Sequence, residues 1–279
     1  MFCSFHCGGY RRLGASTLDE ACKVLKEAGY EYLSLPVLNP IGAFPETVTE
    51  DEIAKIKSTV KKYGITINSF GVIWPSYYMM AATSDKEFAR NLNYTKKLAD
   101  FAAALGVTVM NLGGGRVGRA IPADFTGREA RGKALELIAK LWKETGEYYV
   151  EKGLEVGPES NGKGVLMDDT KEQIAVVDMV DSPSFGITAD FRPMSRIELS
   201  VADALRAAGD RVKLVHIADN NMGIPGSGTL DFIEIFRALK DIGYDERCGE
   251  ICLEARLGDN PLEALKESKR FIEEKWAQA

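Results

Sequence analysis

Four residues in the second half of the chain have side chains that could together bind one divalent metal ion. They are Glu159 in LEVGPES, Asp190 in GITADF, His216 in KLVHIAD and Glu254 in ICLEAR. Each of them ends a short apolar segment whose composition is typical of a β-strand. If the four strands are neighbours in a barrel, their C-terminal ends bring three carboxylates and one imidazole together.

The ligand types indicate which metal and which reaction such a site would support. Three carboxylates and one imidazole form an oxygen-rich set, which favours Mn²⁺, Mg²⁺ or Co²⁺ in octahedral geometry over a structural zinc ion. The metal would polarise the carbonyl of a 2-hydroxy ketone and stabilise the enediolate that remains when the neighbouring C–H proton leaves. Glu159 and Glu254 could lie on opposite faces of the sugar, where one removes a proton and the other returns one.

Each of these four residues also has a simpler explanation when it is taken alone. A single Glu or Asp at a strand end usually caps the next helix or contacts solvent, and a single His in an apolar segment is usually a packed core residue. The metal-site interpretation depends on the four together, because they occupy equivalent places in four successive units. Buried carboxylates without a partner are costly, and a divalent cation supplies that partner.

The chain repeats one pattern of elements that can position these residues. A short β-branched segment ends in a loop, a capping residue opens an amphipathic helix, and a glycine closes that helix. The expected strands are residues 2–7, 32–36, 65–70, 107–112, 154–159, 185–190, 212–217 and 248–254, and the last expected helix is 261–277. Eight alternating units in 279 residues predict a closed (β/α)₈ TIM barrel, with a doubly wound open sheet as the alternative. No linker divides the chain, so we expect a single α/β domain over residues 1–279.

Two finer features follow from the same pattern. Capping boxes are expected at the starts of helices, with Thr17 and Glu20, Thr49 and Glu52, and Ser195 and Glu198 as three of the pairs. Because strand residues alternate, Val212, Leu214 and His216 should share the inward face of the seventh strand. A histidine that ends this inward face at the catalytic end of a barrel is well placed to be a ligand.

Composition and charge restrict the partners of the protein. The net charge of −6 argues against binding to nucleic acid or to an anionic membrane, because both need a basic surface. No run of about 18 apolar residues occurs, so no transmembrane helix is expected. The N-terminal MFCSFHCGGYRR lacks the order of a signal peptide, and the five cysteines are most simply reduced core thiols. These features predict a cytoplasmic protein.

Several motifs give the chain a resemblance to a known family. They are ESN at 159–161, TAD at 188–190, VHIADN at 215–220, PGSGTLDF at 225–232 and CLEA at 252–255. In order and spacing they resemble the xylose-isomerase-like sugar phosphate isomerase/epimerase family, and within it the pattern is most similar to that of the tagatose/psicose 3-epimerases. The resemblance covers nearly the whole chain.

The resemblance implies a fold, a metal and an activity. It implies a TIM barrel with one Mn²⁺-type ion held by Glu159, Asp190, His216 and Glu254, in which the two glutamates are the catalytic acid/base pair. It also implies a small-molecule sugar or keto-polyol substrate, and a homodimer or homotetramer. We therefore expect a metal-dependent sugar epimerase or isomerase.

The chain departs from the ketohexose 3-epimerases at positions that hold substrate hydroxyls. Where those enzymes carry a histidine after the sixth strand, this chain has Pro193, and where they carry an arginine after the seventh, it has Met222. A second glutamate beyond the fifth-strand ligand is also absent, with Lys163 and Val165 nearby. Arg192 is the candidate replacement for part of this polar set. The metal chemistry is kept, and the substrate is left open.

Other residues at expected strand ends are candidates for contact with the substrate. They are His6, Trp74, Asn161, Arg192 and Asp219. Trp74 belongs to the aromatic segment 74–80, which could either cover a sugar ring or form a subunit interface. His6 could equally be a packed strand-end histidine. Asp219 could orient His216 or simply begin a loop with the two asparagines that follow it.

Three other functions remain open at this point. A lyase on the same scaffold, either a keto-polyol dehydratase or a carbon-glycoside-cleaving subunit, would share the proton abstraction and then expel a leaving group. An abasic-site endonuclease would need a histidine-rich metal cluster, and two histidines in an acidic chain disfavour it. A non-enzymatic binding protein would have little use for a complete set of four ligands.

Overall fold

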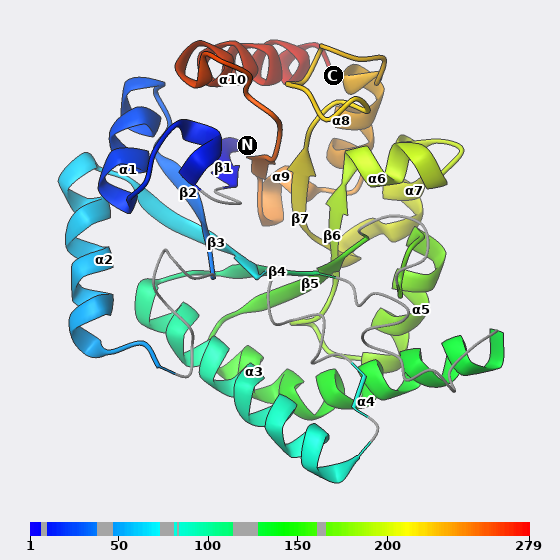
Figure 1. Ribbon diagram of the computed structural model, residues 1–279. Coiled ribbons are helices and arrows are strands. Elements are labelled where there is room, and N and C mark those ends of the chain that lie inside the picture. Colours follow the sequence, from blue (N-terminus) through cyan, green and yellow to red (C-terminus); the bar gives the residue numbers. More distant parts are fainter. Residues whose placement is uncertain (7–9, 38–46, 73–80, 83, 114–127, 161–165) are drawn as a thin grey trace.

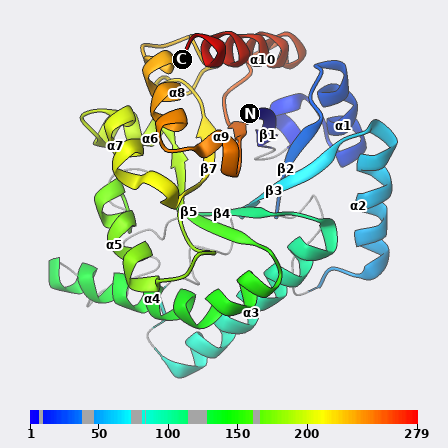
Figure 2. The same cartoon turned by 180° about the vertical axis from the view of Figure 1, so that it is seen from behind.

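The computed structural model describes residues 1–279 except 7–9, 38–46, 73–80, 83, 114–127 and 161–165. In this part of the chain the strands form a closed parallel barrel, in which each strand pairs with the next along the sequence and β1 pairs with β8. Figure 1 shows the helices arranged around the outside of the barrel, and Figure 2 shows the same arrangement from behind. The predicted TIM barrel is confirmed, and the pairing of β1 with β8 excludes the open sheet.

The barrel strands lie where the sequence predicts them, within two residues at each end. They are β1 (Phe2–His6), β2 (Tyr32–Pro36), β3 (Thr66–Val72), β4 (Val109–Gly113), β5 (Glu155–Glu159), β6 (Ile187–Asp190), β7 (Val212–Ile217) and β8 (Glu250–Leu253). The agreement is close because β-branched and apolar segments bounded by glycines and charged residues are strong strand signals.

The helices follow the strands and form the outer layer. They are α1 (Leu18–Glu27), α2 (Glu50–Tyr63), α3 (Asp85–Leu105), α4 (Arg128–Glu151), α5 (Thr170–Val180), α6 (Phe191–Ile197), α7 (Val201–Ala208), α8 (Phe232–Asp241), α9 (Tyr244–Arg247) and α10 (Pro261–Gln278). Short 3₁₀ turns occur at η1 (Tyr10–Leu13) and η3 (Gly209–Arg211). The short helices α6 and α9 were not predicted. Among the described helices, none combines the length and the apolar character needed to cross a membrane.

Helix starts confirm two of the predicted capping pairs and correct the third. Thr49 and Glu52 form a complete capping box at α2, and Thr17 caps α1 by accepting from the backbone of Glu20. The predicted box of Ser195 and Glu198 is wrong, because Ser195 lies inside α6 and its hydroxyl donates to the carbonyl of Arg192. The capping groups there are the Asp190 side chain for α6 and the Ser200 side chain for α7.

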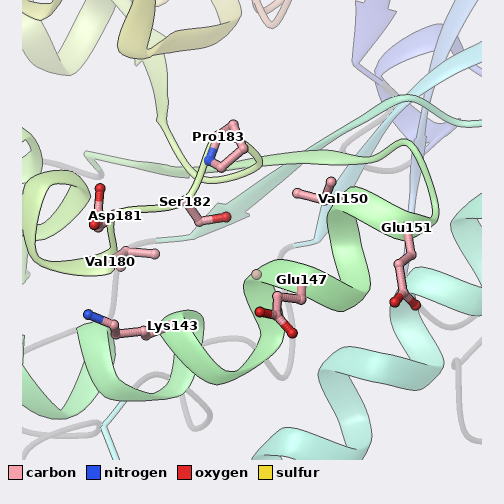
Figure 3. A pocket seen from close by; sticks show the side chains of 9 residues that line it. Lys143, Glu147, Val150, Glu151, Val180, Asp181, Ser182 and Pro183 are labelled. Carbon is pink, nitrogen blue, oxygen red and sulfur yellow. The ribbon is translucent and has the colours of Figure 1, made fainter.

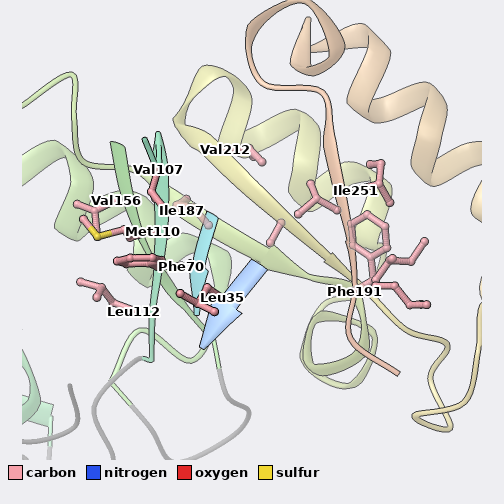
Figure 4. Close-up of a cluster of buried hydrophobic side chains, with 14 of the residues drawn as sticks. Leu35, Phe70, Val107, Met110, Leu112, Val156, Ile187, Phe191, Val212 and Ile251 are labelled. Atoms are coloured by element: carbon pink, nitrogen blue, oxygen red, sulfur yellow. The ribbon is translucent and has the colours of Figure 1, made fainter. Parts of the chain in front are cut away.

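The apolar core lies between the outer face of the barrel and the helices. Met110, Val156 and Ile187 alternate along their strands with inward residues and are buried under the helix layer (Figure 4). Aromatic pairs join the two layers, with the rings of Phe70 on β3 and Phe101 on α3 centred 5.1 Å apart. This apolar packing supports the strands from outside, so that their inward side chains can be polar.

The inside of the barrel contains a buried carboxylate on β8. Glu250 is fully buried, and it accepts hydrogen bonds from Ser4 Oγ at 2.5 Å, Ser69 Oγ at 2.8 Å and Asn68 Nδ2 at 2.5 Å. Burial raises the pKa of Glu250, while the three donors act in the opposite direction. These bonds connect β1, β3 and β8 across the interior, and no charged partner is needed.

Gly157 on β5 allows β6 to approach closely. A Cβ atom at this position would lie 2.6 Å from the backbone carbon of Ile187 and 2.6 Å from the backbone nitrogen of Thr188. The Thr188 hydroxyl donates to the Gly157 carbonyl at 2.9 Å, which keeps the two strands together. Since neither backbone atom can move without shifting β6, the spacing beside Glu159 and Asp190 depends on glycine here.

Gly157→Ala is therefore expected to lower the free energy of unfolding by about 1–3 kcal/mol, the usual cost of overpacking. Gly132 on α4 is the matched control, because it is exposed and a Cβ there would meet nothing within 4 Å. Gly132→Ala should raise stability by about 0.5–1 kcal/mol through helix propensity. Urea unfolding of both variants measures the two effects, and equal shifts would contradict the packing argument.

Candidate metal centre

The four predicted ligands come together at the C-terminal mouth of the barrel. Nδ1 of His216 lies 3.0 Å from Oε1 of Glu159 and 2.9 Å from Oε2 of Glu254. One carboxylate oxygen from each of Glu159, Asp190 and Glu254 lies within 4.8 Å of the other two. The strand register explains this, since Asp190 pairs with His216 and the Glu254 backbone N–H donates to the Ile217 carbonyl at the end of β7.

The carboxylates of this cluster are buried close to one another, which makes their negative charge unfavourable without a nearby positive charge. Burial raises the pKa of Asp190 well above its usual range, and the nearby carboxylates of Glu159 and Glu254 raise it further. Burial lowers the pKa of His216, but the Glu159 carboxylate and the hydrogen bonds to the imidazole outweigh burial and bring that pKa well above its usual value. A proton on His216 thus occupies a place where positive charge is strongly favoured.

Glu254 has the most cationic surroundings of the three carboxylates. Burial opposes its ionisation, but the imidazoles of His6 and His216 and the Arg12 guanidinium together lower its pKa. Asp190 is also the N-cap of α6, where Oδ1 accepts from the Arg192 backbone N–H at 3.0 Å. The simpler explanation of Asp190 as a capping residue is therefore correct, and its other carboxylate oxygen can still face the cluster.

Asn111 orients Glu159 from the neighbouring strand β4. Its Nδ2 donates to Oε2 of Glu159 at 2.9 Å, and both side chains are buried. Oε1 of Glu159 is left to face Nδ1 of His216. Asn111 was not among the predicted site residues. Its position near the end of the fourth expected strand, on the inward face, is the signal that points to a role at the mouth.

Two further groups approach the centre from the β1 side of the barrel. Nδ1 of His6 and Nη1 of Arg12 each lie 3.6 Å from Oε1 of Glu254. His6 is almost fully buried, and neither of its ring nitrogens has a hydrogen-bond partner. Its ring is packed so closely on β3 that a Cβ on Gly71 would lie 2.0 Å from Nε2. The predicted substrate residue His6 is therefore at the mouth, whereas Arg12 was not predicted at all.

The other predicted substrate residues have different positions. Arg192 begins α6 beside Asp190, and its Nε atom is buried without a hydrogen-bond partner. Asp219 is fully buried, and its carboxylate accepts from the backbone N–H groups of Asn220, Gly226 and Leu230. These are the contacts of a residue that holds the loop after β7 in place. Trp74 and Asn161 lie outside the described residues.

A hollow elsewhere on the described surface lacks a cluster of carboxylates around an imidazole like the one at the barrel mouth. It lies between the C-terminal part of α4 and the segment that leads into β6, and it is lined by Lys143, Glu147, Val150, Asp181 and Ser182, among others (Figure 3). Because it is near the N-terminal ends of the strands, it is at the opposite end of the barrel from the carboxylate cluster. TIM-barrel active sites form at the C-terminal ends.

Comparison with known proteins agrees with the barrel fold. Residues 22–275 match the family described as the xylose isomerase-like TIM barrel. The chain belongs to this family. The match covers more than half of the chain and includes β2 to β8, and with them all four predicted ligands.

Individual relatives in this family are epimerases of different sugars. The chain is 28% identical over 202 residues to a D-psicose 3-epimerase of Enterocloster bolteae, a match that covers 70% of this chain and 64% of that enzyme. It is 26% identical over 220 residues to an L-ribulose 3-epimerase of Methylomonas sp., covering 78% and 72%. The structure of the 3-keto-D-glucoside 4-epimerase YcjR from E. coli has the same fold, with a TM-score of 0.79, 18% identity and coverage of 98% and 99%.

The contact between Asn111 and Glu159 leads to a prediction about metal affinity. Asn111→Leu removes the donor that orients Glu159, and loss of such a supporting hydrogen bond typically weakens metal binding by about 10- to 100-fold. Asn68→Leu is the matched control, because Asn68 donates to Glu250 and to no predicted ligand. Calorimetric titration with Mn²⁺ measures both variants. Equal affinities for Asn111→Leu and the unmodified protein would show that Asn111 does not support Glu159.

Proposed function

We propose that this protein is a divalent-metal-dependent epimerase or isomerase that acts on a ketose or keto-polyol. The observation that carries the proposal is the convergence of Glu159, Asp190, Glu254 and His216 at the mouth of the barrel. The relatives named above as sugar epimerases support it. Their names differ in the sugar and in the carbon that is inverted, so the proposal covers the reaction class.

The residues of the cluster fit a divalent ion. Three carboxylates around one imidazole form an oxygen-rich set of ligands, and burial together with the neighbouring carboxylates of Glu159 and Glu254 raises the pKa of Asp190, so a divalent cation would be favourable here. We assign Glu159, Asp190, His216 and Glu254 as the ligands of Mn²⁺, Mg²⁺ or Co²⁺. A bound ion of this kind supplies Lewis acidity toward the carbonyl oxygen of the substrate.

Glu159 and Glu254 are the groups that move the proton in this proposal. They reach the centre from β5 and from the end of β8, and both contact Nδ1 of His216. In this proposal the substrate binds between them. One carboxylate removes the proton from the carbon beside the carbonyl, and the other, once protonated, returns a proton to the opposite face. Asn111 keeps Glu159 in orientation, and burial of the cluster limits access of water.

A lyase on the same centre is the second candidate. It would use the same proton removal and then expel a hydroxyl or an aglycone from the next carbon. The observation that favours it is the absence of the ketohexose contacts, since Pro193 is buried in α6 and Met222 lies in the loop after β7 with φ of 70°. The product decides between the two candidates.

Solvent exchange is the direct test of the proposal. In D₂O, the Mn²⁺-loaded protein should place deuterium at a carbon beside the carbonyl of its substrate, and a chelator should abolish the exchange. Glu159→Gln and Glu254→Gln should each lower the exchange rate by about 10²- to 10⁴-fold, the usual contribution of a general acid or base. Glu155→Gln is the control, because Glu155 begins the same strand and pairs with Lys213.

Proton NMR of a panel of ketoses, inososes and 3-keto-glycosides follows the exchange and identifies the product. A new stereoisomer indicates an epimerase or isomerase, and loss of a hydroxyl or an aglycone indicates the lyase. Exchange that persists in the metal-free protein or in both glutamine variants would contradict the proposed roles of the two glutamates.

Thermal stability tests the ligand assignment without any substrate. Mn²⁺ at about 100 times its dissociation constant should stabilise the protein by about 2.7 kcal/mol, which is a rise of roughly 5–10 °C in Tm. Asp190→Asn and His216→Asn should remove most of this rise, whereas Glu155→Gln should keep it. Differential scanning calorimetry with and without Mn²⁺ provides the measurement, and an equal rise in all variants would place the ion elsewhere.

A further inference from the structure

Arg12 brings a permanent positive charge to the candidate metal centre from a loop that the proposed reaction does not use. It belongs to the 3₁₀ turn η1 that follows β1, and its Nη1 atom lies 3.6 Å from Oε1 of Glu254. The side chain is 29% exposed, so part of it reaches solvent, whereas its Nη1 atom is buried beside Glu254. A guanidinium has five N–H donors in a planar fork, and it stays charged at any pH the enzyme meets.

None of the described residues is shown to accept a hydrogen bond from the Arg12 guanidinium. Its separation from Glu254 is longer than a hydrogen bond, and its buried Nη1 atom has no hydrogen-bond partner. His6 beside it is also buried, and neither of its ring nitrogens has a hydrogen-bond partner. A buried donor without an acceptor is costly, so this part of the centre is suited to a ligand that carries acceptors.

A divalent ion at the centre would also change what Arg12 pairs with. Glu159, Asp190 and Glu254 contribute three negative charges, and a divalent ion contributes two positive charges. Arg12 then brings the total to zero before any substrate enters. A divalent ion would also share the Glu254 carboxylate, which weakens the only ion pair that Arg12 makes among the described residues. The guanidinium is then free to pair with a second anion.

We propose that Arg12, with His6 beside it, binds an anionic group of the substrate, so that the natural substrate is a keto-sugar acid or a keto-sugar phosphate. The inference rests on the proposed function and specifies its substrate class. A planar guanidinium fork matches a carboxylate or a phosphate through two parallel hydrogen bonds, which no hydroxyl of a neutral sugar can accept with comparable strength. The His6 imidazole can add a further N–H donor.

Matched pairs of substrates test this inference in the full-length protein loaded with Mn²⁺. The probes are D-fructose with D-fructuronate, D-tagatose with D-tagaturonate, and D-fructose 6-phosphate. Calorimetric binding should favour the anion over the neutral ketose by at least about tenfold, as expected for charge-assisted hydrogen bonds. Comparison of the uronates with the phosphate shows which anion the pocket takes.

Variants separate this role of Arg12 from a role in holding Glu254. In Arg12→Gln the ratio of anion to ketose affinity should fall by about 10- to 100-fold, and Arg12→Lys should keep part of it because it retains the charge without the fork. Arg270→Gln on α10 controls for loss of one positive charge, because its side chain is 71% exposed. A loss of Mn²⁺ affinity in Arg12→Gln with an unchanged ratio would show that Arg12 serves only Glu254, and the inference would be wrong.

The two proposals fail in different ways. Equal binding of ketose and anion by the unmodified protein overturns the anion pocket, while exchange in D₂O on the neutral ketose still supports the epimerase. Anion binding that depends on Arg12, together with no exchange on any probe, supports the pocket and contradicts the reaction. A rise in ionic strength should weaken binding of the uronates more than that of the ketoses if the pocket is correct.

Discussion

Three carboxylates held around one buried imidazole are the constraint on which the rest of this structure depends. Closure of the barrel puts the ends of β5, β6, β7 and β8 side by side, and the side chains that end them cannot separate. Mutual repulsion and burial then raise the pKa of Asp190 and, through the carboxylates, the pKa of His216. Such an arrangement is favoured where positive charge is present, which is the physical reason for proposing a metal centre here.

The rest of the barrel holds this costly cluster in place. Apolar packing between strands and helices stabilises the outer face, and hydrogen bonds order the polar side chains within. Asn111 orients Glu159 from one side, and below the mouth Glu250 connects β1, β3 and β8 through donors that lie far away in the sequence. Ser4 and Glu250, for example, are 246 positions apart. The carboxylates at the mouth therefore rest on a rigid frame.

The two sides of the centre differ in charge and in available donors. The β5 and β6 side carries carboxylates whose partners are an amide and a backbone N–H, whereas the β1 side carries Arg12 and His6. In the proposed reaction, a substrate over the centre would meet proton-transfer groups from β5 and β8 and donors from β1. The donors outside the four proposed ligands come from separate loops, and loops of this kind are the parts of a TIM barrel that can vary while the scaffold is kept.

The sequence by itself determined the TIM barrel, the strand ends and the four residues that converge there. These follow from local signals, namely the period of the apolar segments, the capping residues and the rule that parallel strands present their C-terminal residues at one end. It did not place Ser195 correctly, because α6 begins after Asp190 and α7 after Ser200, so that Ser195 lies inside a helix and not at the start of one. Arg12, Asn111 and the contacts of Glu250 were decided by tertiary structure alone. Pairing of β1 with β8 brings residues from opposite ends of the chain into contact, and no local pattern in the sequence records such a contact.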